Sequence, residues 1–352
     1  MSNSPASDIA EDRPRATVHD VARKAGVSLA TVDRVLNGRP GVRQVTAERV
    51  AAAIEALDFR RDLSASLLAR SRDFNIRFLI PGGSNAFMEN LGAAIRRRAR
   101  LVRSERLRVE TTLIEALDPA GLAATLDGLA RKSCDCAIIV ATEDPQVLRA
   151  VDAASRRGIA VLTLVSDLPQ SARRHFIGID NVAAGRTAAG LLGRFCPGGG
   201  HIGIIAGSLD LRDHADRLSG FLAVMQHDFP ALYIVGPFEG HDSDDETEAL
   251  AGRLLGDPSL VGLYNLGAGN AGLIAALERS GQAGKVRVVA HEVTGPTRGA
   301  LNSGAIDVVL DQNPDHEIRA AISAARVLGQ HGSGRLDEHP IEIGIFLRDN
   351  LR

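Results

Sequence analysis

The chain has 352 residues, of which 45% are hydrophobic, and this allows two or three domains that each bury a core. Aromatic residues make up only 3% and tryptophan is absent, so the core must consist mainly of Val, Ile, Leu and Ala. The formal net charge of −2 does not by itself indicate a nucleic-acid partner. No apolar run reaches the length of a membrane span, which excludes a protein built on transmembrane helices.

The charge is unevenly distributed along the chain. Residues 13–72 carry twelve Arg and Lys residues against six Asp and Glu residues, a net charge of +6, so the rest of the chain is acidic. A basic segment on an acidic body is typical of a module that binds phosphates, although an ordinary solvated surface has the same composition. Residues 1–14 contain no apolar stretch, and we expect a disordered tail there and not a signal peptide.

The sequence offers no catalytic or metal-binding set. Three cysteines, Cys134, Cys136 and Cys196, form no disulfide framework, and their odd number suggests reduced thiols in the cytosol. Cys134 and Cys136 could provide half of a metal site, but no second Cys or His pair completes it, so packed thiols are expected. No Ser or Cys has a base at a recognisable spacing, and the chain is not expected to be an enzyme.

Residues 17–46 have the pattern of a helix-turn-helix. Thr17 is a natural N-cap with Asp20 three residues later, and apolar residues then recur at helical spacing. Gly26 provides a helix stop, because a left-handed residue without a Cβ is not strained. Ser28 caps a second helix whose buried stripe consists of Val32, Val35 and Leu36. Its outer face, the part that a recognition helix presents to the major groove, consists of Leu29, Ala30, Thr31, Asp33 and Arg34.

The literal string resembles the headpiece of the lactose-repressor family of bacterial transcription factors, which begins T-x-x-D-V-A-x-x-A-G-V-S-x-x-T-V-S-x-V-L-N. The matching residues are Thr17, Asp20, Val21, Ala22, Ala25, Gly26, Val27, Ser28, Thr31, Val32, Val35, Leu36 and Asn37. The departure is Asp33 in place of the usual Ser; it could accept from a cytosine amine or pair with Arg34. The resemblance implies DNA contacts from Thr17, Ser28, Leu29, Ala30, Thr31, Arg34, Asn37 and, further on, Leu68.

A third helix is expected to begin at Thr46, with an apolar stripe that consists of Val50, Ile54 and Leu57. The three helices would form one DNA-binding headpiece, residues 15–60. In the resembled family the next segment, residues 61–73 here, is a hinge helix that folds only on operator DNA. The resemblance implies that Leu68 enters the minor groove as an apolar wedge. Arg61 replaces the family's usual Pro, and a plain basic linker is the alternative.

From residue 74 onward, short apolar runs alternate with helical patterns. The runs are residues 76–80, 108–114, 136–140, 160–165, 176–180, 201–207, 233–238, 261–266, 286–292, 307–311 and 342–347. The helical patterns are residues 91–103, 119–132, 146–157, 183–195, 217–226, 243–255, 270–280 and 315–329. This alternation predicts parallel sheets covered on both faces, and its length predicts two doubly wound α/β lobes.

The core also resembles the same family and, through it, the periplasmic sugar-binding proteins of the ribose-binding type. The matching pieces are Ser84-Asn85-Ala86-Phe87-Met88, Ile179-Asp180-Asn181, Ala184-Gly185, Arg217-Leu218-Ser219-Gly220-Phe221 and Asp311-Gln312-Asn313-Pro314. The resemblance implies a homodimer in which the chain crosses between lobes three times, near residues 168–175, 293–304 and 312–318. The expected N-lobe is residues 74–170 plus 297–314, and the expected C-lobe is residues 175–294 plus 316–352.

Ligands of open parallel sheets bind beyond the carboxyl ends of the strands. The residues there suit a sugar or polyol because they combine carboxylates, amides, arginines and an aromatic face. They are Asn85, Phe87, Glu143, Asp144, Asp167, Arg212, Asp213, Arg217, Asn265, Glu292 and Gln312. The resemblance implies sugar contacts at Asn85, Phe87, Glu292 and Gln312. The relatives' sugar-binding Arg is replaced by Ala215, and their Asn-Asp pair by residues 266–268.

One motif indicates a different ligand. Residues 267–272, Gly-Ala-Gly-Asn-Ala-Gly, follow a strand, and Glu292 lies 20 residues further on, which satisfies a dinucleotide fingerprint. A tight turn whose backbone amides face the cleft is the other interpretation, and no cofactor is expected. We therefore predict a cytoplasmic, dimeric repressor of a carbohydrate or polyol operon, controlled by a sugar-like effector. The alternatives are a plain solute-binding protein and an NAD-dependent enzyme.

Overall fold

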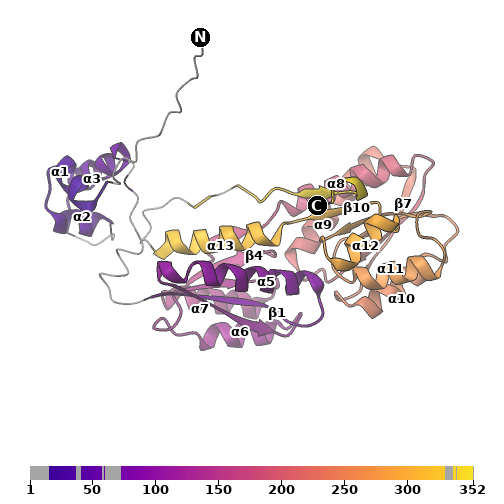
Figure 1. Ribbon diagram of the computed structural model, residues 1–352, viewed down its shortest axis with the longest axis horizontal. Helices are drawn as coiled ribbons and strands as arrows, with labels where there is room; N and C mark the ends of the chain where they lie inside the picture. The colour runs from indigo at the N-terminus through magenta and orange to yellow at the C-terminus, as the bar shows by residue number, and fades with distance from the viewer. Residues whose placement is uncertain are drawn as a thin grey trace, which may run out of the picture. The chain divides into compact units, whose positions relative to one another are not determined.

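The computed structural model describes residues 16–36, 41–57, 59, 73–329, 336–337 and 339–351 (Figure 1). The chain divides into a headpiece unit, Met1–Ser71 with Arg326–Arg335, and a core unit, Arg72–Ala325 with Leu336–Arg352. The predicted tail, residues 61–72 of the predicted hinge with Leu68, and Asn37 lie outside the described residues. Within the part described, no helix has both the length and the apolar character needed to cross a membrane.

The headpiece consists of three helices, α1 (Val18–Ala25), α2 (Leu29–Leu36) and α3 (Gln44–Ala56). Their apolar sides meet in one small core, whose buried members are Val21, Ala22, Ala25, Val32, Leu36, Val50 and Ala53. The predicted helix-turn-helix with a third packing helix is confirmed. Helix α3 begins at Gln44 and not at Thr46, because the extended backbone of Arg43 sets its start without any side-chain cap.

Local hydrogen bonds set the ends of α1 and α2. The Thr17 amide donates to Asp20 Oδ2 (2.9 Å), and the Asp20 amide donates to Thr17 Oγ1 (3.3 Å), which completes a capping box. Gly26 ends α1 with φ +63°, in the left-handed region. The Thr31 amide donates to Ser28 Oγ (3.1 Å) at the start of α2. The caps predicted for both helices are therefore present.

The first lobe of the core is a five-stranded parallel sheet in the order β2-β1-β3-β4-β5. Its strands are β1 (Phe74–Pro81), β2 (Leu107–Ile114), β3 (Cys136–Ile139), β4 (Ala160–Leu164) and β5 (His175–Ile177). Its helices are α5 (Ala86–Leu101), the short η1 (Arg103–Glu105), α6 (Pro119–Gly128) and α7 (Pro145–Arg156). Helices α6 and α7 share one apolar cluster with β1, β3 and β4, so they cover the same face of the sheet.

The second lobe is a six-stranded sheet in the order β11-β10-β9-β8-β6-β7, parallel except for β11. Its strands are β6 (Gly200–Ala206), β7 (Leu232–Glu239), β8 (Leu260–Asn265), β9 (Arg287–His291), β10 (Val308–Asp311) and β11 (Gly344–Phe346). Helices α8 (Asn181–Phe195) and α9 (Arg212–Asp228) pack on one face. Helices α10 (Asp244–Leu254), α11 (Asn270–Arg279) and α12 (Gly295–Ser303) pack on the other, and η2 (Arg348–Asn350) follows β11. The two predicted α/β lobes are confirmed.

Of the expected crossings between the lobes, one lies a few residues further along the chain and another is wrong. Strand β5 pairs with β4, so the segment near residues 168–175 remains in the first lobe and the chain crosses after β5. Strand β10 pairs with β9 and β11, so residues 297–314 do not complete the first sheet. Residues 293–304 contain α12, a short helix rich in Gly, Thr and Pro whose sequence resembles a loop.

Helix α13 (Pro314–Gly329) follows β10, near the predicted crossing at residues 312–318. Arg97 of α5 and Asp315 of α13 form an ion pair (2.8 Å), so this helix begins against the first lobe (Figure 1). The chain then enters β11 of the second sheet, and two connecting segments meet at a bridge between Ile179 and Ile341. Residues 316–329 therefore do not belong with the second lobe as expected.

The carboxyl ends of the two sheets face one another across a cleft. The Glu143 amide donates to the Asp210 carbonyl (2.9 Å), which joins the first lobe to the second. The Asn85 amide group reaches Asp242 Oδ2 (3.5 Å) at another point of the same edge. These contacts bring the loops of both lobes close enough to enclose the side chains between them.

Candidate functional site

Two parts of the molecule carry candidate functional groups, and the first is the outer face of α2. Ser28, Ala30 and Arg34 are exposed, and Leu29 keeps 42% of its side-chain surface accessible. Thr31 is half-buried, and its hydroxyl lies 2.9 Å from that of Ser28. An exposed short helix with hydroxyl, apolar and guanidinium groups can reach base edges in a major groove.

The packing of α1 against α3 holds this face in place. Arg49 of α3 donates to the Ala25 carbonyl at the end of α1 (2.6 Å). Val32 on the inner side of α2 is fully buried, so the outer side must point to solvent. Thr17 is exposed but its hydroxyl donates to Asp20 within the capping box (2.7 Å). A phosphate contact by Thr17 would have to come from its backbone or share this hydroxyl.

The second part is the cleft of the core, where buried polar atoms gather at the strand ends of both lobes. Several of these atoms have no hydrogen-bond partner in the described part of the chain. They are Thr142 Oγ1, Ser166 Oγ, Asp213 Oδ1, Arg217 Nη2, Asn265 Oδ1, Gln312 Oε1 and Nε2, and both carboxyl oxygens of Glu317. Buried polar atoms in folded proteins are nearly always bonded, so such a concentration indicates a place for a polar ligand.

Arg217 of α9 is the arginine of this buried polar set, and its side chain is fully buried. Its Nε–H donates to Asn181 Oδ1 (2.9 Å) and its Nη1–H to the Leu266 carbonyl (2.8 Å). Its Nη2 lies 3.7 Å from Asp213 Oδ2. Helices α8 and α9 approach so closely here that a Cβ at Gly185 would lie 1.9 Å from the Arg217 carbonyl oxygen. The matched Ala-Gly sequence is thus a packing requirement that fixes the arginine.

Glu292 directly follows β9 and has φ +75°, a left-handed backbone that is rare outside glycine and is often found at functional sites. Asn313 after β10 of the same sheet (φ +55°) and Val165 after β4 of the other sheet (φ +66°) share this conformation. Burial, reinforced by Asp242, raises the pKa of the Glu292 carboxyl to about 8. A protonated carboxyl can both donate and accept at neutral pH.

Glu317, in the first turn of α13, is completely buried. Burial raises the pKa of its carboxyl well above the usual range, and the neighbouring Asp311 adds to that effect. The sequence analysis missed this residue. The available signal was an acid on an apolar helical stripe, because the next buried residues of α13 are Ile318, Ala321, Ile322 and Ala325.

Four of the predicted effector residues lie at the rim of the cleft. Asn85 Oδ1 accepts from the amides of Phe87 and Met88, so it caps α5 and is already occupied. Asp144 caps α7 by accepting from the Gln146 amide (2.6 Å). Glu143 and Arg212 are partly exposed and pair with each other across the lobes (3.5 Å).

Two further predicted residues belong to the first lobe, and one of them, Asp167, also lines an open cavity between the lobes. Asp167 accepts from the Thr163 hydroxyl (2.6 Å), the Leu168 amide (2.7 Å) and the guanidinium of Arg173 (2.5 and 2.6 Å). Phe87 is 2% exposed and packs in the interior. The predicted residues that gather in the buried part of the cleft are therefore Asp213, Arg217, Asn265, Glu292 and Gln312.

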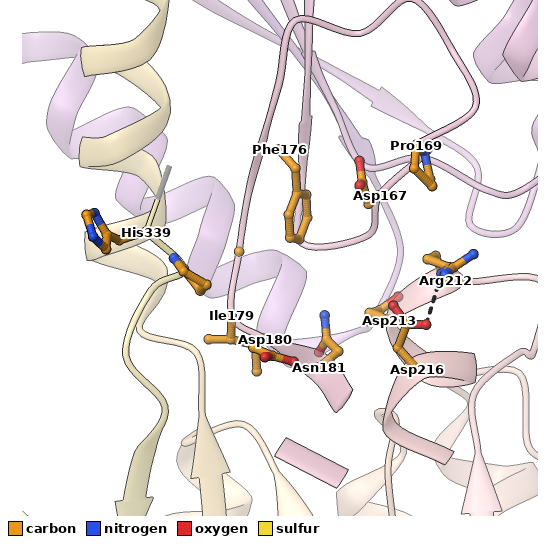
Figure 2. Close-up of a pocket in the computed structure, with 12 residues that line it drawn as sticks. Asp167, Pro169, Phe176, Ile179, Asp180, Asn181, Arg212, Asp213, Asp216 and His339 are labelled. Carbon is orange, nitrogen blue, oxygen red and sulfur yellow. Dashed lines mark hydrogen bonds and ion pairs between the residues drawn. The ribbon is translucent and has the colours of Figure 1, made fainter. Parts of the chain in front are cut away.

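An open cavity of about 320 Å³ adjoins this set near the segments that connect the lobes. Figure 2 shows Arg212, Asp213 and Asp216 on one side of it and His339 on the other. Asp213 lines the cavity and also belongs to the buried polar set. The volume falls within the range of small-molecule sites.

The glycine-rich turn at residues 267–272 is occupied by the protein itself. The amides of Ala271 and Gly272 donate to Asp244 Oδ1 (3.1 and 3.3 Å), and the Ala268 amide donates to Asp242 Oδ1 (2.9 Å). A Cβ at Gly272 would lie 1.8 Å from the Asp244 carbonyl oxygen, so this glycine allows α10 and α11 to pack. Aspartate carboxylates thus take the amides that a pyrophosphate would need. The alternative prediction, that these amides face the cleft, is wrong for the same reason.

The cysteines are buried and free, and burial raises the pKa of Cys134 to about 11. Among the described residues, no cluster of His, Cys, Asp and Glu could hold a metal ion. His291 is buried beside the Tyr264 hydroxyl (2.9 Å), and desolvation holds its pKa well below the usual range. A neutral imidazole in this position supports the cleft floor.

Comparison with known proteins supports both parts. A family model described as bacterial regulatory proteins of the lacI family matches residues 17–62, and one described as a periplasmic binding protein domain matches residues 76–333. Over 79 residues the chain is 40% identical to catabolite control protein A of Streptococcus mutans and 42% identical to that of Priestia megaterium. These matches cover 22% of this chain and 24% of each relative, so they span about a quarter of the relatives' length.

Solved structures resemble the core. The glucose-galactose binding protein GanP of Geobacillus stearothermophilus matches with a TM-score of 0.71 at 18% identity, over 80% of this chain and 99% of its own. A solute-binding protein of Burkholderia graminis, solved with D-arabinose, matches with a TM-score of 0.72 at 20% identity, over 79% of this chain and 96% of its own. At this identity the likeness establishes the fold.

Proposed function

Since the chain belongs to the periplasmic binding protein domain family and carries a lacI-family regulatory domain at its N-terminus, we propose that it is a sequence-specific DNA-binding regulator. Its operator affinity is controlled by a small polyhydroxylated effector in the cleft of the core. It acts in the cytoplasm as a homodimer and represses a carbohydrate or polyol operon. The protein needs no cofactor and catalyses no reaction in this role.

The observation that carries the proposal is the headpiece. Its match to the lacI family model coincides with three packed helices, and Leu29, Ala30 and Arg34 of α2 are exposed. In a dimer, two such helices would read the halves of a pseudo-palindromic site. We assign base and backbone contacts to Ser28, Leu29, Ala30, Thr31 and Arg34, with Thr17 and Asn37 at the edges. Leu68 is the proposed minor-groove wedge.

The cleft supports the effector half of the proposal. Asp213, Arg217, Asn265 and Gln312 are buried there, and each has at least one polar atom without a partner among the described residues. These atoms can bond hydroxyl groups of a ligand, and Glu292 adds a carboxyl at the end of β9. The residues of the rim, Asn85, Glu143, Asp144 and Arg212, would close over it.

Regulation would follow from the two-lobe architecture. The crossings after β5 and after β10 would act as a hinge, and the contacts of Glu143 with Asp210 and of Asn85 with Asp242 would break if the cleft opened. An effector that binds the closed form more tightly shifts the equilibrium toward it. In the dimer that shift would change the spacing of the headpieces and hence operator affinity.

A plain solute-binding protein would use the same cleft, but it would have no use for the headpiece. An NAD-dependent enzyme is disfavoured because Asp244 occupies the amides at the start of α11. These two alternatives predict no preference among DNA sequences.

The test is selection of duplexes from a random pool with the full-length protein, followed by anisotropy titrations. We expect an enriched pseudo-palindrome, and Arg34→Ala should weaken binding to it by about 1–3 kcal/mol while affinity for random DNA changes little. Sugars and polyols added to the wild type should change operator affinity. If no sequence is enriched, the regulator proposal is wrong.

A further inference from the structure

The polar atoms of the cleft are not balanced between donors and acceptors. Five of the atoms without a partner act only as acceptors when the carboxyls are ionised, and two act only as donors. The hydroxyls of Thr142 and Ser166 can do either. The acceptors are Asp213 Oδ1, Asn265 Oδ1, Gln312 Oε1 and both carboxyl oxygens of Glu317. The dedicated donors are Arg217 Nη2 and Gln312 Nε2. A ligand that is rich in hydrogen-bond donors would therefore complement the cleft best.

The charges are unbalanced in the same direction. Glu292 and Glu317 form no ion pair within the described part of the chain. Asp213 and Asp311 act electrostatically on both of these carboxyls, and so does Arg217, the cation with the largest effect on either. Arg217 already has Asp213 at 3.7 Å and two neutral acceptors. Its charge cannot neutralise two further buried carboxylates.

The position of Glu317 makes this imbalance specific. It lies on α13, which begins against the first lobe, while Glu292 directly follows β9 of the second lobe. Strands β9 and β10 are neighbours, and the Glu292 amide donates to the Leu310 carbonyl at the end of β10 (2.7 Å). The Glu317 amide donates to the Asn313 carbonyl just after the same strand (3.1 Å), so both glutamates lie beyond the ends of adjacent strands. A group bound between them would touch elements from both sides of the hinge.

We propose that the effector is a hydroxylated amine, such as an amino sugar or amino polyol, whose ammonium group binds the carboxyls of Glu292 and Glu317. This rests on the proposed function, since it names the class of effector for the same cleft. An ammonium group provides three hydrogen-bond donors for the unpaired acceptors and one positive charge for the buried carboxyls. The hydroxyl groups of the ligand would bond Gln312, Asn265 and Asp213.

Binding should release protons. In the ligand-free protein burial raises the pKa of Glu292 to about 8, so this carboxyl holds a proton at pH 7, and burial raises the pKa of Glu317 as well. An ammonium group beside them favours the ionised form, and each carboxyl that ionises gives its proton to the buffer. A neutral polyol would bond the protonated carboxyls and release none. Calorimetry in buffers of different ionisation enthalpy counts these protons.

The experiment uses the full-length protein and matched pairs of ligands. D-glucosamine, D-galactosamine and 1-amino-1-deoxy-D-glucitol are compared with D-glucose, D-galactose and D-glucitol by thermal shift and then by calorimetry at pH 7. We expect at least one amine to bind about tenfold or more tightly than its neutral partner, with proton release. Equal or tighter binding of the neutral partners, or no binding by any amine at about 10 mM, would overturn the proposal.

Glu317→Gln is the matched variant, since an amide copies the shape of the protonated carboxyl and should not disturb the fold. It should weaken amine binding about tenfold and reduce proton release, while binding of a neutral partner changes little. Glu292→Gln is the second variant and should behave alike. Glu278→Gln, an exposed position on α11, is the control. An unchanged amine affinity in both cleft variants would contradict the assignment.

This outcome is separate from that of the regulator proposal. Operator selection and titration need no effector, so sequence-specific DNA binding can succeed while every amine fails. A neutral sugar that changes operator affinity would likewise keep the regulator and remove the amine. If the protein binds an amine but shows no sequence-specific DNA binding, the amine assignment stands and the regulator proposal fails.

Discussion

The headpiece and the cleft differ in how their functional groups are arranged along the chain. In the headpiece the described groups that we assign to DNA lie between Thr17 and Arg34, on two adjacent helices. In the cleft, the buried polar groups extend from Thr142 to Glu317 and come from both lobes. One region is a local structure, and the other exists only after eleven strands have assembled into two sheets.

The two regions also differ in how their polar groups are satisfied. In the headpiece, Thr17 bonds Asp20 and Ser28 bonds Thr31, so the fold completes its own hydrogen bonds. In the cleft, Gln312 and Glu317 are buried without partners among the described residues. We therefore expect headpiece stability to depend on local geometry, and core stability to depend on pH and ligand.

The largest expected effect concerns Glu292. Its pKa is raised from 4.5 to about 8, so the folded core binds a proton that the unfolded chain loses at lower pH. The stability that this proton provides is complete below pH 4.5 and is lost as pH rises through about 8. Glu292→Gln should remove this loss and raise the unfolding free energy of the ligand-free core at pH 8 or above, by up to about 4 kcal/mol.

Urea denaturation at several pH values between 5 and 8.5 measures this effect. Glu317 should keep part of the pH dependence in the variant, because its pKa is also raised. Glu278→Gln controls for the loss of a surface carboxylate. If Glu292→Gln and the wild type lose stability in parallel, Glu292 is not desolvated and the contrast between the two regions is weakened.

The same contrast explains what could be predicted from the sequence. The eleven strands of the described residues were all expected from short apolar runs, because inner strands such as β3 and β8 are buried on both faces. The outer strands β2 and β7 are partly exposed. Helix α12 was missed, since a nine-residue helix that contains Gly, Pro and Thr has no clear apolar period. Lobe membership was partly wrong, because strand pairing between distant segments such as β10 and β11 leaves no local signal.

The site was predictable only in part. Position after a strand identified Asp213, Asn265, Glu292 and Gln312 as neighbours, since parallel strands end at one edge. It could not distinguish a free side chain from one used by the fold, as with Asn85, which caps α5. It also did not select Glu317, because this residue lies on α13, several positions beyond the end of β10.

An effect of intermediate size is expected from a substitution that destabilises the headpiece and leaves the core unchanged. Gly26 has φ +63°, and a Cβ there would lie 2.8 Å from Arg49 Nη2, which bonds the Ala25 carbonyl. Gly26→Val should destabilise the headpiece by about 2–3 kcal/mol through backbone strain and loss of that bond. Hydrogen exchange of α1–α3 amides should accelerate and specific DNA binding should fall. Core exchange and ligand binding should stay unchanged.

Gly26→Asn is the matched control, since Asn tolerates the left-handed region better than a β-branched residue. The headpiece stability of Gly26→Asn should lie between that of the wild type and that of Gly26→Val. If Gly26→Val also alters exchange in the cleft, the two regions are not independent.

The smallest effect concerns the capping box. Thr17→Ala removes the hydroxyl that accepts from the Asp20 amide and should cost the headpiece about 1 kcal/mol. Thr17→Ser keeps the hydroxyl, so its α1 amides should exchange at the rate of the wild type. In Thr17→Ala the α1 amides should exchange about fivefold faster. DNA affinity then separates two roles for one side chain. If Thr17→Ala weakens DNA binding by no more than the loss of headpiece stability measured by amide exchange, the hydroxyl affects binding only by stabilising α1. A larger loss would mean that it also contacts DNA directly, and that even the local region uses one group for both folding and recognition.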